Sequence, residues 1–174
     1  MVTASYGCGD ATSGVDSCVG TVANGGSLDT SSVGQHTFTV TARDHAGNER
    51  TKTVTYTVVF AFAGFFEPVA NPPTVNVTRA GKGVPLPFGL GGDYGLAIFA
   101  AGYPQAQTIA CDPKAKTKNV AGKDVSSSSL SYDKKANRYT YTWKTDQSWA
   151  NSCRQLNLKL TDGTVHTVLF KLTR

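Results

Sequence analysis

The chain has 174 residues, of which 40% are hydrophobic and 17% are charged, and its formal net charge is +5. It is too apolar for a disordered tail and too poor in charged residues for a coiled coil. The longest apolar run, residues 58–66, has about half the roughly 20 residues that a membrane-spanning helix needs. A membrane span is therefore excluded.

The charge is distributed unevenly along the chain. Residues 1–62 contain three basic and five acidic residues, whereas residues 63–174 contain fourteen basic and seven acidic residues. Such a shift in composition indicates a domain boundary. Prolines at 68, 72 and 73 lie close to the shift and oppose both helix and ladder formation. We therefore expect two domains, residues 1–61 and residues 62–174.

Alternation of apolar and polar residues, which is typical of strands, dominates the first half. In residues 36–42 and 53–60, apolar side chains alternate with threonines on most of the intervening positions. The segment between them, residues 43–49, contains the Asp, Gly and Asn that tight turns favour. This pattern predicts a hairpin with one buried apolar face and one threonine-covered face in water.

The second half alternates in the same way. Residues 84–90 form a candidate strand, but Pro85 and Pro87 cannot donate to a ladder, so this strand is expected at a sheet edge or with a bulge. Asp162-Gly163 predicts a tight hairpin turn. Three further runs each place apolar side chains at alternating positions: Tyr139, Tyr141 and Trp143; Leu156, Leu158 and Leu160; Val168, Phe170 and Leu172. We interpret the first run, Tyr139, Tyr141 and Trp143, as core.

Short strands with regular turn signals favour an all-β fold, with a β-sandwich or a β-barrel in each half. Of these, we predict two small antiparallel β-sandwich domains in tandem.

Four cysteines allow three disulfide pairings. We expect Cys8–Cys18 and Cys111–Cys153, because each half then closes its own bridge, with free structural thiols as the alternative. The cysteine spacing fits no zinc pattern, and no metal or other cofactor is expected.

The first half resembles a bacterial Ig-like repeat of the HYR-like kind. The resemblance rests on residues 6–10, 13–18, 28–30, 34–42 and 44–48. It implies an Ig-like sandwich used as a spacer or adhesive module, with the family's bridge at Cys8 and Cys18. Such repeats usually have a strand or two before the segment of Cys8, so we expect the first strand to be missing. An open edge left in this way invites self-association by strand pairing.

The second half, from about residue 62, resembles the PxKF domain of secreted bacterial proteins. The resemblance rests on residues 64–69, 71–73, 91–96, 139–141, 143–145, 153–154 and 169–171. The motif that names this family stands here as Pro85-Leu86-Pro87-Phe88, with Pro87 where the family has lysine. No settled activity comes with either resemblance.

The sequence carries no recognisable catalytic motif. The sequence has no Gly-x-Ser-x-Gly motif, and its histidines, His36, His45 and His166, are scattered. We therefore expect no enzymatic activity. Asp10 and Asp16 are candidates for binding calcium, and the alternative is that they cap turns.

Two sets of residues are candidates for ligand binding. The first is a basic loop after Cys111, which suits anionic cell-wall polymers or acidic polysaccharides unless it is only a solvated loop. No nucleic-acid-binding motif accompanies it, so no specific nucleic acid is expected. The second set is aromatic and lies outside the clear strands, where it could stack on sugars. The two sets are Lys114, Lys116, Lys118 and Lys123, and Tyr94, Tyr103 and Trp149.

These observations lead to one main functional prediction and one alternative. The main prediction is a non-catalytic, secreted or cell-surface accessory region that acts as a spacer and positions a catalytic or adhesive part of a larger protein. The alternative is a binding module for carbohydrate or a cell-wall polymer.

Overall fold

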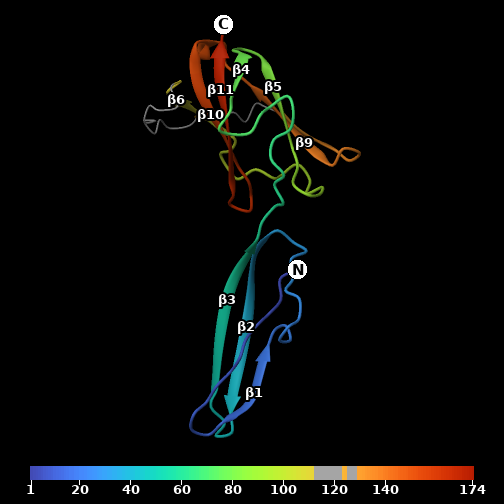
Figure 1. Ribbon diagram of the computed structural model, residues 1–174, viewed down its shortest axis with the longest axis vertical. Helices are drawn as coiled ribbons and strands as arrows, with labels where there is room; N and C mark the ends of the chain where they lie inside the picture. Colours follow the sequence, from blue (N-terminus) through green and yellow to red (C-terminus); the bar gives the residue numbers. More distant parts are fainter. Residues whose placement is uncertain (112–122, 125–128) are drawn as a thin grey trace. The chain divides into compact units, whose positions relative to one another are not determined.

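The computed structural model describes residues 1–111, 123–124 and 129–174, except for the side chains of residues 123 and 124. Over these residues the fold is all-β, as predicted, and the helical structure is one short 3₁₀ turn at Gln147–Trp149. The chain forms two compact units, which we call unit 1 (Met1–Val59) and unit 2 (Phe60–Arg174) (Figure 1).

Unit 1 contains an antiparallel sheet in the order β1-β2-β3 (Figure 1). Its strands are β1 (Val15–Gly20), β2 (Gly34–Asp44) and β3 (Glu49–Val58). The predicted hairpin is confirmed as β2 and β3, which pair without a bulge from Gly34–Val58 to Arg43–Glu49. Pairing between β1 and β2 is interrupted by a bulge between Val15 and Ser17.

The apolar face of this sheet is only partly covered, so the prediction of a buried face is wrong. Phe38 and Val40 are half-buried, and Val54 remains 50% exposed. Within unit 1, all of whose residues are described, only Ala4 is a fully buried apolar residue. The physical reason is that the irregular segment 3–9, and not a second sheet, lies opposite this face. That segment is held by bonds such as Ala4 N–H to the Gly26 carbonyl at 2.8 Å.

Unit 2 is a sandwich of two sheets. The larger has the order β4-β11-β10-β6-β7, and the smaller has the order β5-β9-β8. The larger sheet comprises β4 (Val75–Arg79), β6 (Gln105–Ile109), β7 (Lys123–Asp124), β10 (Ser152–Lys159) and β11 (Val165–Thr173). The smaller sheet comprises β5 (Gly83–Phe88), β8 (Ser129–Asp133) and β9 (Arg138–Lys144).

Strand pairing in unit 2 confirms most of the sequence expectations. β5 lies at an edge of its sheet, the position expected for a strand that contains Pro85 and Pro87. The hairpin at Asp162-Gly163 joins β10 to β11. One pair departs from the antiparallel prediction, because β4 runs parallel to β11 from Val75–Leu169 to Arg79–Thr173.

The core of unit 2 lies between its sheets and contains the predicted aromatic and aliphatic faces. Trp143 of the smaller sheet contacts Phe170 of the larger sheet, with ring centroids 5.0 Å apart. Tyr139, Tyr141 and Trp143, which the sequence assigned to the core, are at most 2% exposed, and so are the six aliphatic and aromatic side chains of the two other alternating runs. The predicted alternation is therefore confirmed here, where a second sheet covers each apolar face.

All four cysteines are paired, and the pairing is the predicted one. Cys8 bonds to Cys18 across 10 residues, and Cys111 bonds to Cys153 across 42 residues. Each bridge lies within one unit.

Candidate functional site

A groove of about 700 Å³ lies on the partly covered face of unit 1. One side of its lining is segment 3–9, and the rest comes from Leu28 and from side chains of β2 and β3 that share one face. The strand residues in the lining are Phe38, Val40, Ala42, Arg50, Lys52, Val54 and Tyr56.

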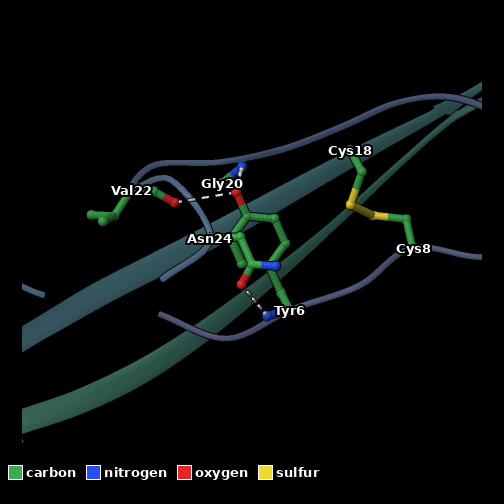
Figure 2. Close-up of a disulfide and its surroundings, with 6 residues drawn as sticks. All are labelled: Tyr6, Cys8, Cys18, Gly20, Val22 and Asn24. Atoms are coloured by element: carbon green, nitrogen blue, oxygen red, sulfur yellow. Dashed lines mark hydrogen bonds between the residues drawn. A yellow bond between two sulfur atoms is a disulfide. The ribbon is translucent and has the colours of Figure 1, made fainter. Parts of the chain in front are cut away.

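Two contacts anchor segment 3–9 beside β1 (Figure 2). The first is the Cys8–Cys18 disulfide. The second is the Tyr6 hydroxyl, which accepts the N–H of Gly20 at 3.0 Å and donates to the Val22 carbonyl at 3.3 Å. Gly20 is needed at this position, because a Cβ there would lie 2.8 Å from the Tyr6 ring. The Tyr6 ring also packs against Phe38.

The groove combines apolar side chains with two cations. Arg50 and Lys52 precede Val54 and Tyr56 at two-residue spacing on β3, so all four belong to the same face. Within unit 1, neither Arg50 nor Lys52 takes part in an ion pair. The groove can therefore accept an extended group that is apolar along its length or anionic near the cations.

Sequence analysis missed this groove, although a signal was present. Arg50 and Lys52 continue the alternation of Val54 and Tyr56 toward the turn. A strand face that changes from apolar to cationic is not a fully buried face.

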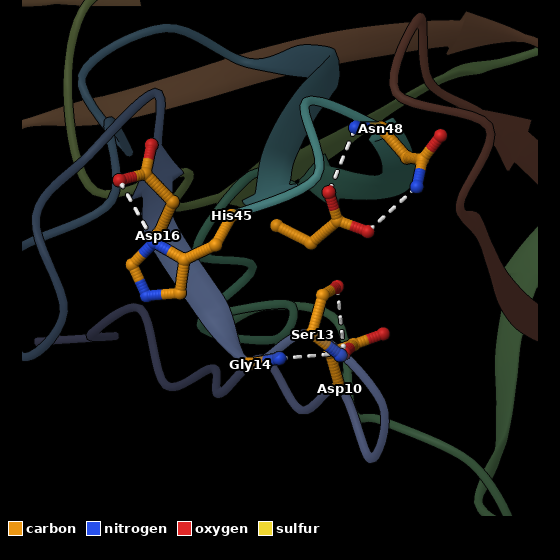
Figure 3. Close-up of polar contacts among 7 residues, drawn as sticks. Asp10, Ser13, Gly14, Asp16, His45 and Asn48 are labelled. Atoms are coloured by element: carbon orange, nitrogen blue, oxygen red, sulfur yellow. Dashed lines mark hydrogen bonds and ion pairs between the residues drawn. The ribbon is translucent and has the colours of Figure 1, made fainter.

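Asp10, one of the two calcium candidates, caps a turn (Figure 3). Asp10 accepts backbone N–H groups of Thr12, Ser13 and Gly14 through one oxygen, at 2.7–3.0 Å. These bonds, that from Ser13 above all, lower the pKa of Asp10. The contacts match the turn-capping alternative for Asp10.

Asp16, the other calcium candidate, faces a histidine. Its carboxylate lies 3.7 Å from Nδ1 of His45, and both side chains are exposed. In the described part of the chain, no group of three or more His, Cys, Asp and Glu side chains is arranged to hold a metal ion.

The expectation that Trp149 could stack on a sugar is wrong, because its ring is buried. Trp149 is 8% exposed, and its ring lies 6.0 Å from that of Trp143 in the core of unit 2. The Arg154 guanidinium covers it at 4.6 Å from the ring centroid. Burial lowers the pKa of Arg154, against the opposing charge of Asp146. The short 3₁₀ turn folds Trp149 inward, a local feature that strand alternation does not reveal.

The other two aromatic candidates have separate partners. Tyr94 is 44% exposed, its ring edge packs on Phe60, and its N–H donates to the Tyr139 hydroxyl at 2.6 Å. Tyr103 is half-buried, with the Lys159 ammonium 5.8 Å from its ring. Among the described residues, the rings of Tyr94, Tyr103 and Trp149 each contact a different partner, and none of these contacts joins one of the three to another.

The basic loop falls largely outside the described residues. Lys114, Lys116 and Lys118 lie there entirely, and for Lys123 only the backbone is described, in β7.

His166, one of the three scattered histidines of the sequence, is a half-buried titratable group in unit 2. Its ring stacks on Phe62 at 3.6 Å, and its Nε2 lies 3.0 Å from the Thr164 hydroxyl. Burial lowers the pKa of His166, and the nearby Asp162 carboxylate opposes this shift.

Comparisons of the chain with protein-family models, with curated proteins and with solved structures found no match. The two family resemblances therefore stay predictions from sequence motifs. The described residues contain no helix long and apolar enough to cross a membrane.

Proposed function

We propose that this chain is a non-catalytic extracellular accessory region that acts as a spacer and positions a catalytic or adhesive part of a larger secreted protein. The observation that supports the proposal is the placement of the disulfides, one closed within each unit. Disulfides persist in oxidising compartments such as the cell exterior. Bridges within units limit how far each unit can extend when its ends are pulled.

The construction of unit 2 also suits a load-bearing role. Its terminal strand β11 lies between β4 and β10, so both edges of β11 are hydrogen-bonded along the sheet. Asn76 adds side-chain bonds from its amide to the carbonyls of Ala70 and Leu169, at 3.0 and 3.2 Å. A force applied at the chain end must break this ladder before the core opens.

Pulling the full chain from its two ends with optical tweezers tests the spacer proposal. We expect two resolved unfolding events, one for each unit. Both units should stay folded at forces below these events. A chain that extends smoothly, without resolved events, cannot hold a distance under load and would contradict the proposal.

A second candidate function, sugar binding, is supported by Tyr94. Its ring is partly exposed, while its backbone bond to Tyr139 and its edge contact with Phe60 fix its position. A fixed, accessible aromatic ring suits stacking on a sugar face.

Co-sedimentation of the full chain with insoluble polysaccharides and bacterial cell walls tests this candidate. Binding that survives moderate salt and is lost in Tyr94→Ala would support it. The matched control is Leu96→Ala, because Leu96 lies on the same loop and is 58% exposed. Equal binding by wild type and Tyr94→Ala, or none at all, would dismiss the candidate.

A further inference from the structure

β3 is a long strand with one free edge. It pairs with β2 over ten residues, and no other strand in the described residues pairs with it. Residues 49–55 of β3 are exposed on both faces of the strand. A long, regular edge strand presents unpaired N–H and C=O groups that can bind another strand.

The opposite edge of the sheet is less suited to strand addition. β1 has only six residues and contains the bulge near Val15 and Ser17. In addition, the Tyr6 hydroxyl occupies the N–H of Gly20. An added strand is therefore expected on β3 and not on β1.

We infer that β3 pairs antiparallel with β3 of a second copy of this chain, with Val54 opposite Val54. In this register the two sheets join into one six-stranded sheet around a two-fold axis perpendicular to it. The groove face of one copy continues into the groove face of the other. The inference does not depend on the spacer role proposed above.

The sequence of β3 is complementary to itself in this register. Lys52 lies opposite Tyr56, and Arg50 lies opposite Val58, so no like charges face each other. On the other face Thr53 lies opposite Thr55, a pairing that stabilises sheets. The two Val54 side chains, each 50% exposed in the single chain, cover each other at the axis.

Other registers of the two β3 strands are less favourable, because they mismatch the faces or bring charged side chains to unfavourable positions. A shift by one residue sets the apolar face of one copy against the threonine face of the other. Centring on Lys52 places two ammonium groups opposite each other. Centring on Thr53 keeps the faces matched but sets each exposed Val54 against a Lys52 side chain.

Sedimentation of the full, oxidised chain at concentrations up to about 1 mM tests the inference. We expect a monomer–dimer equilibrium that Val54→Lys and Val54→Glu each weaken at least tenfold. Mixing these two variants should restore association, because opposite charges then meet at the axis. The matched control Val19→Lys, at a 62% exposed position on β1, should associate like the wild type.

Cross-linking provides a second readout that does not depend on charge. Val54→Cys should form an intermolecular disulfide on oxidation, because opposed residues of paired strands lie within disulfide reach. A chain that stays monomeric at about 1 mM overturns the inference. So does an equal effect of Val19→Lys and Val54→Lys, or efficient self-cross-linking of Lys52→Cys in place of Val54→Cys.

Discussion

The Asp162 carboxylate accepts the backbone N–H of Phe60 at 2.8 Å and so ties the first residue of unit 2 to the β10–β11 turn. The same side chain accepts the N–H and hydroxyl of Thr164, at 2.8 and 2.7 Å. Burial alone would raise the pKa of Asp162, but the bonds from Thr164 and Phe60 outweigh it and lower the pKa. This carboxylate therefore caps the turn and also makes a long-range hydrogen bond to a residue 102 positions away in the chain.

Replacing Asp162 should destabilise unit 2. Asp162→Ala leaves the N–H of Phe60, a residue only 7% exposed, without its acceptor. The expected loss is about 1–3 kcal/mol of unfolding free energy, measured by urea denaturation. The control Asp133→Ala removes a local turn cap, which accepts N–H groups of Lys135 and Ala136. Water can replace that cap. Equal losses in the two variants would therefore contradict a stabilising role of the Phe60–Asp162 hydrogen bond.

The stability of unit 2 should fall as the pH drops below 6.5. His166 has a pKa lowered from 6.5 by burial, so the folded chain takes up this proton less readily than the unfolded chain. The contribution of His166 to stability is therefore fully present above pH 6.5. It is lost as the pH falls from 6.5 through the lower pKa of the folded state. Urea unfolding at pH 8 and pH 5 measures the difference.

Two histidine variants isolate this effect. His166→Gln should reduce the loss of stability between pH 8 and pH 5, since the titrating ring against Phe62 is gone. His45→Gln, at an exposed site in unit 1, should leave the loss unchanged. If the wild type and His166→Gln lose the same stability, His166 is not the source.

Trp149→Ala should act as a core mutation and not as a change at a binding surface. The substitution removes a ring that contacts both Trp143 and the Arg154 guanidinium. We expect a loss of about 3–5 kcal/mol, and a smaller one for Trp149→Phe, which retains an aromatic ring. Thermal unfolding followed by near-UV circular dichroism measures both. Tyr94→Ala, at a 44% exposed ring, is the comparison, and a similar stability for it and Trp149→Ala would refute the assignment.

Local sequence pattern was sufficient for the strands. The alternation around Phe38 and Val54 predicted β2 and β3, and the face of Tyr139 and Trp143 was correctly placed in a core. The prolines of β5 correctly predicted an edge, since a missing N–H restricts where a strand can lie. In each case the residues that determine the strand or its position lie close together in the chain.

Features that depend on distant segments could not be predicted in this way. Whether the face of Val54 is covered depends on segment 3–9, and that segment has no strand pattern of its own. The parallel pairing of β4 with β11 joins residues more than ninety positions apart, such as Val75 and Leu169. The groove with Arg50 and Lys52 follows from that missing coverage, so the candidate site was less predictable than the fold.

Reducing the disulfides should lengthen the chain released on mechanical unfolding. The Cys111–Cys153 bridge spans 42 residues, which corresponds to about 14 nm of extended chain. The Cys8–Cys18 bridge spans 10 residues, or about 3 nm. Optical-tweezers pulling with and without reductant measures the added length of each unfolding event.

The same loop lengths order the losses of equilibrium stability. By the chain-entropy model, Cys111→Ala with Cys153→Ala should cost about 4 kcal/mol, and Cys8→Ala with Cys18→Ala about 3 kcal/mol. The double variants serve as controls for the pulling experiment, because reductant should no longer lengthen the event of the altered unit. If reductant does not change the length of chain that the wild type releases on unfolding, the bridges do not limit extension. The spacer proposal would then lose its main support.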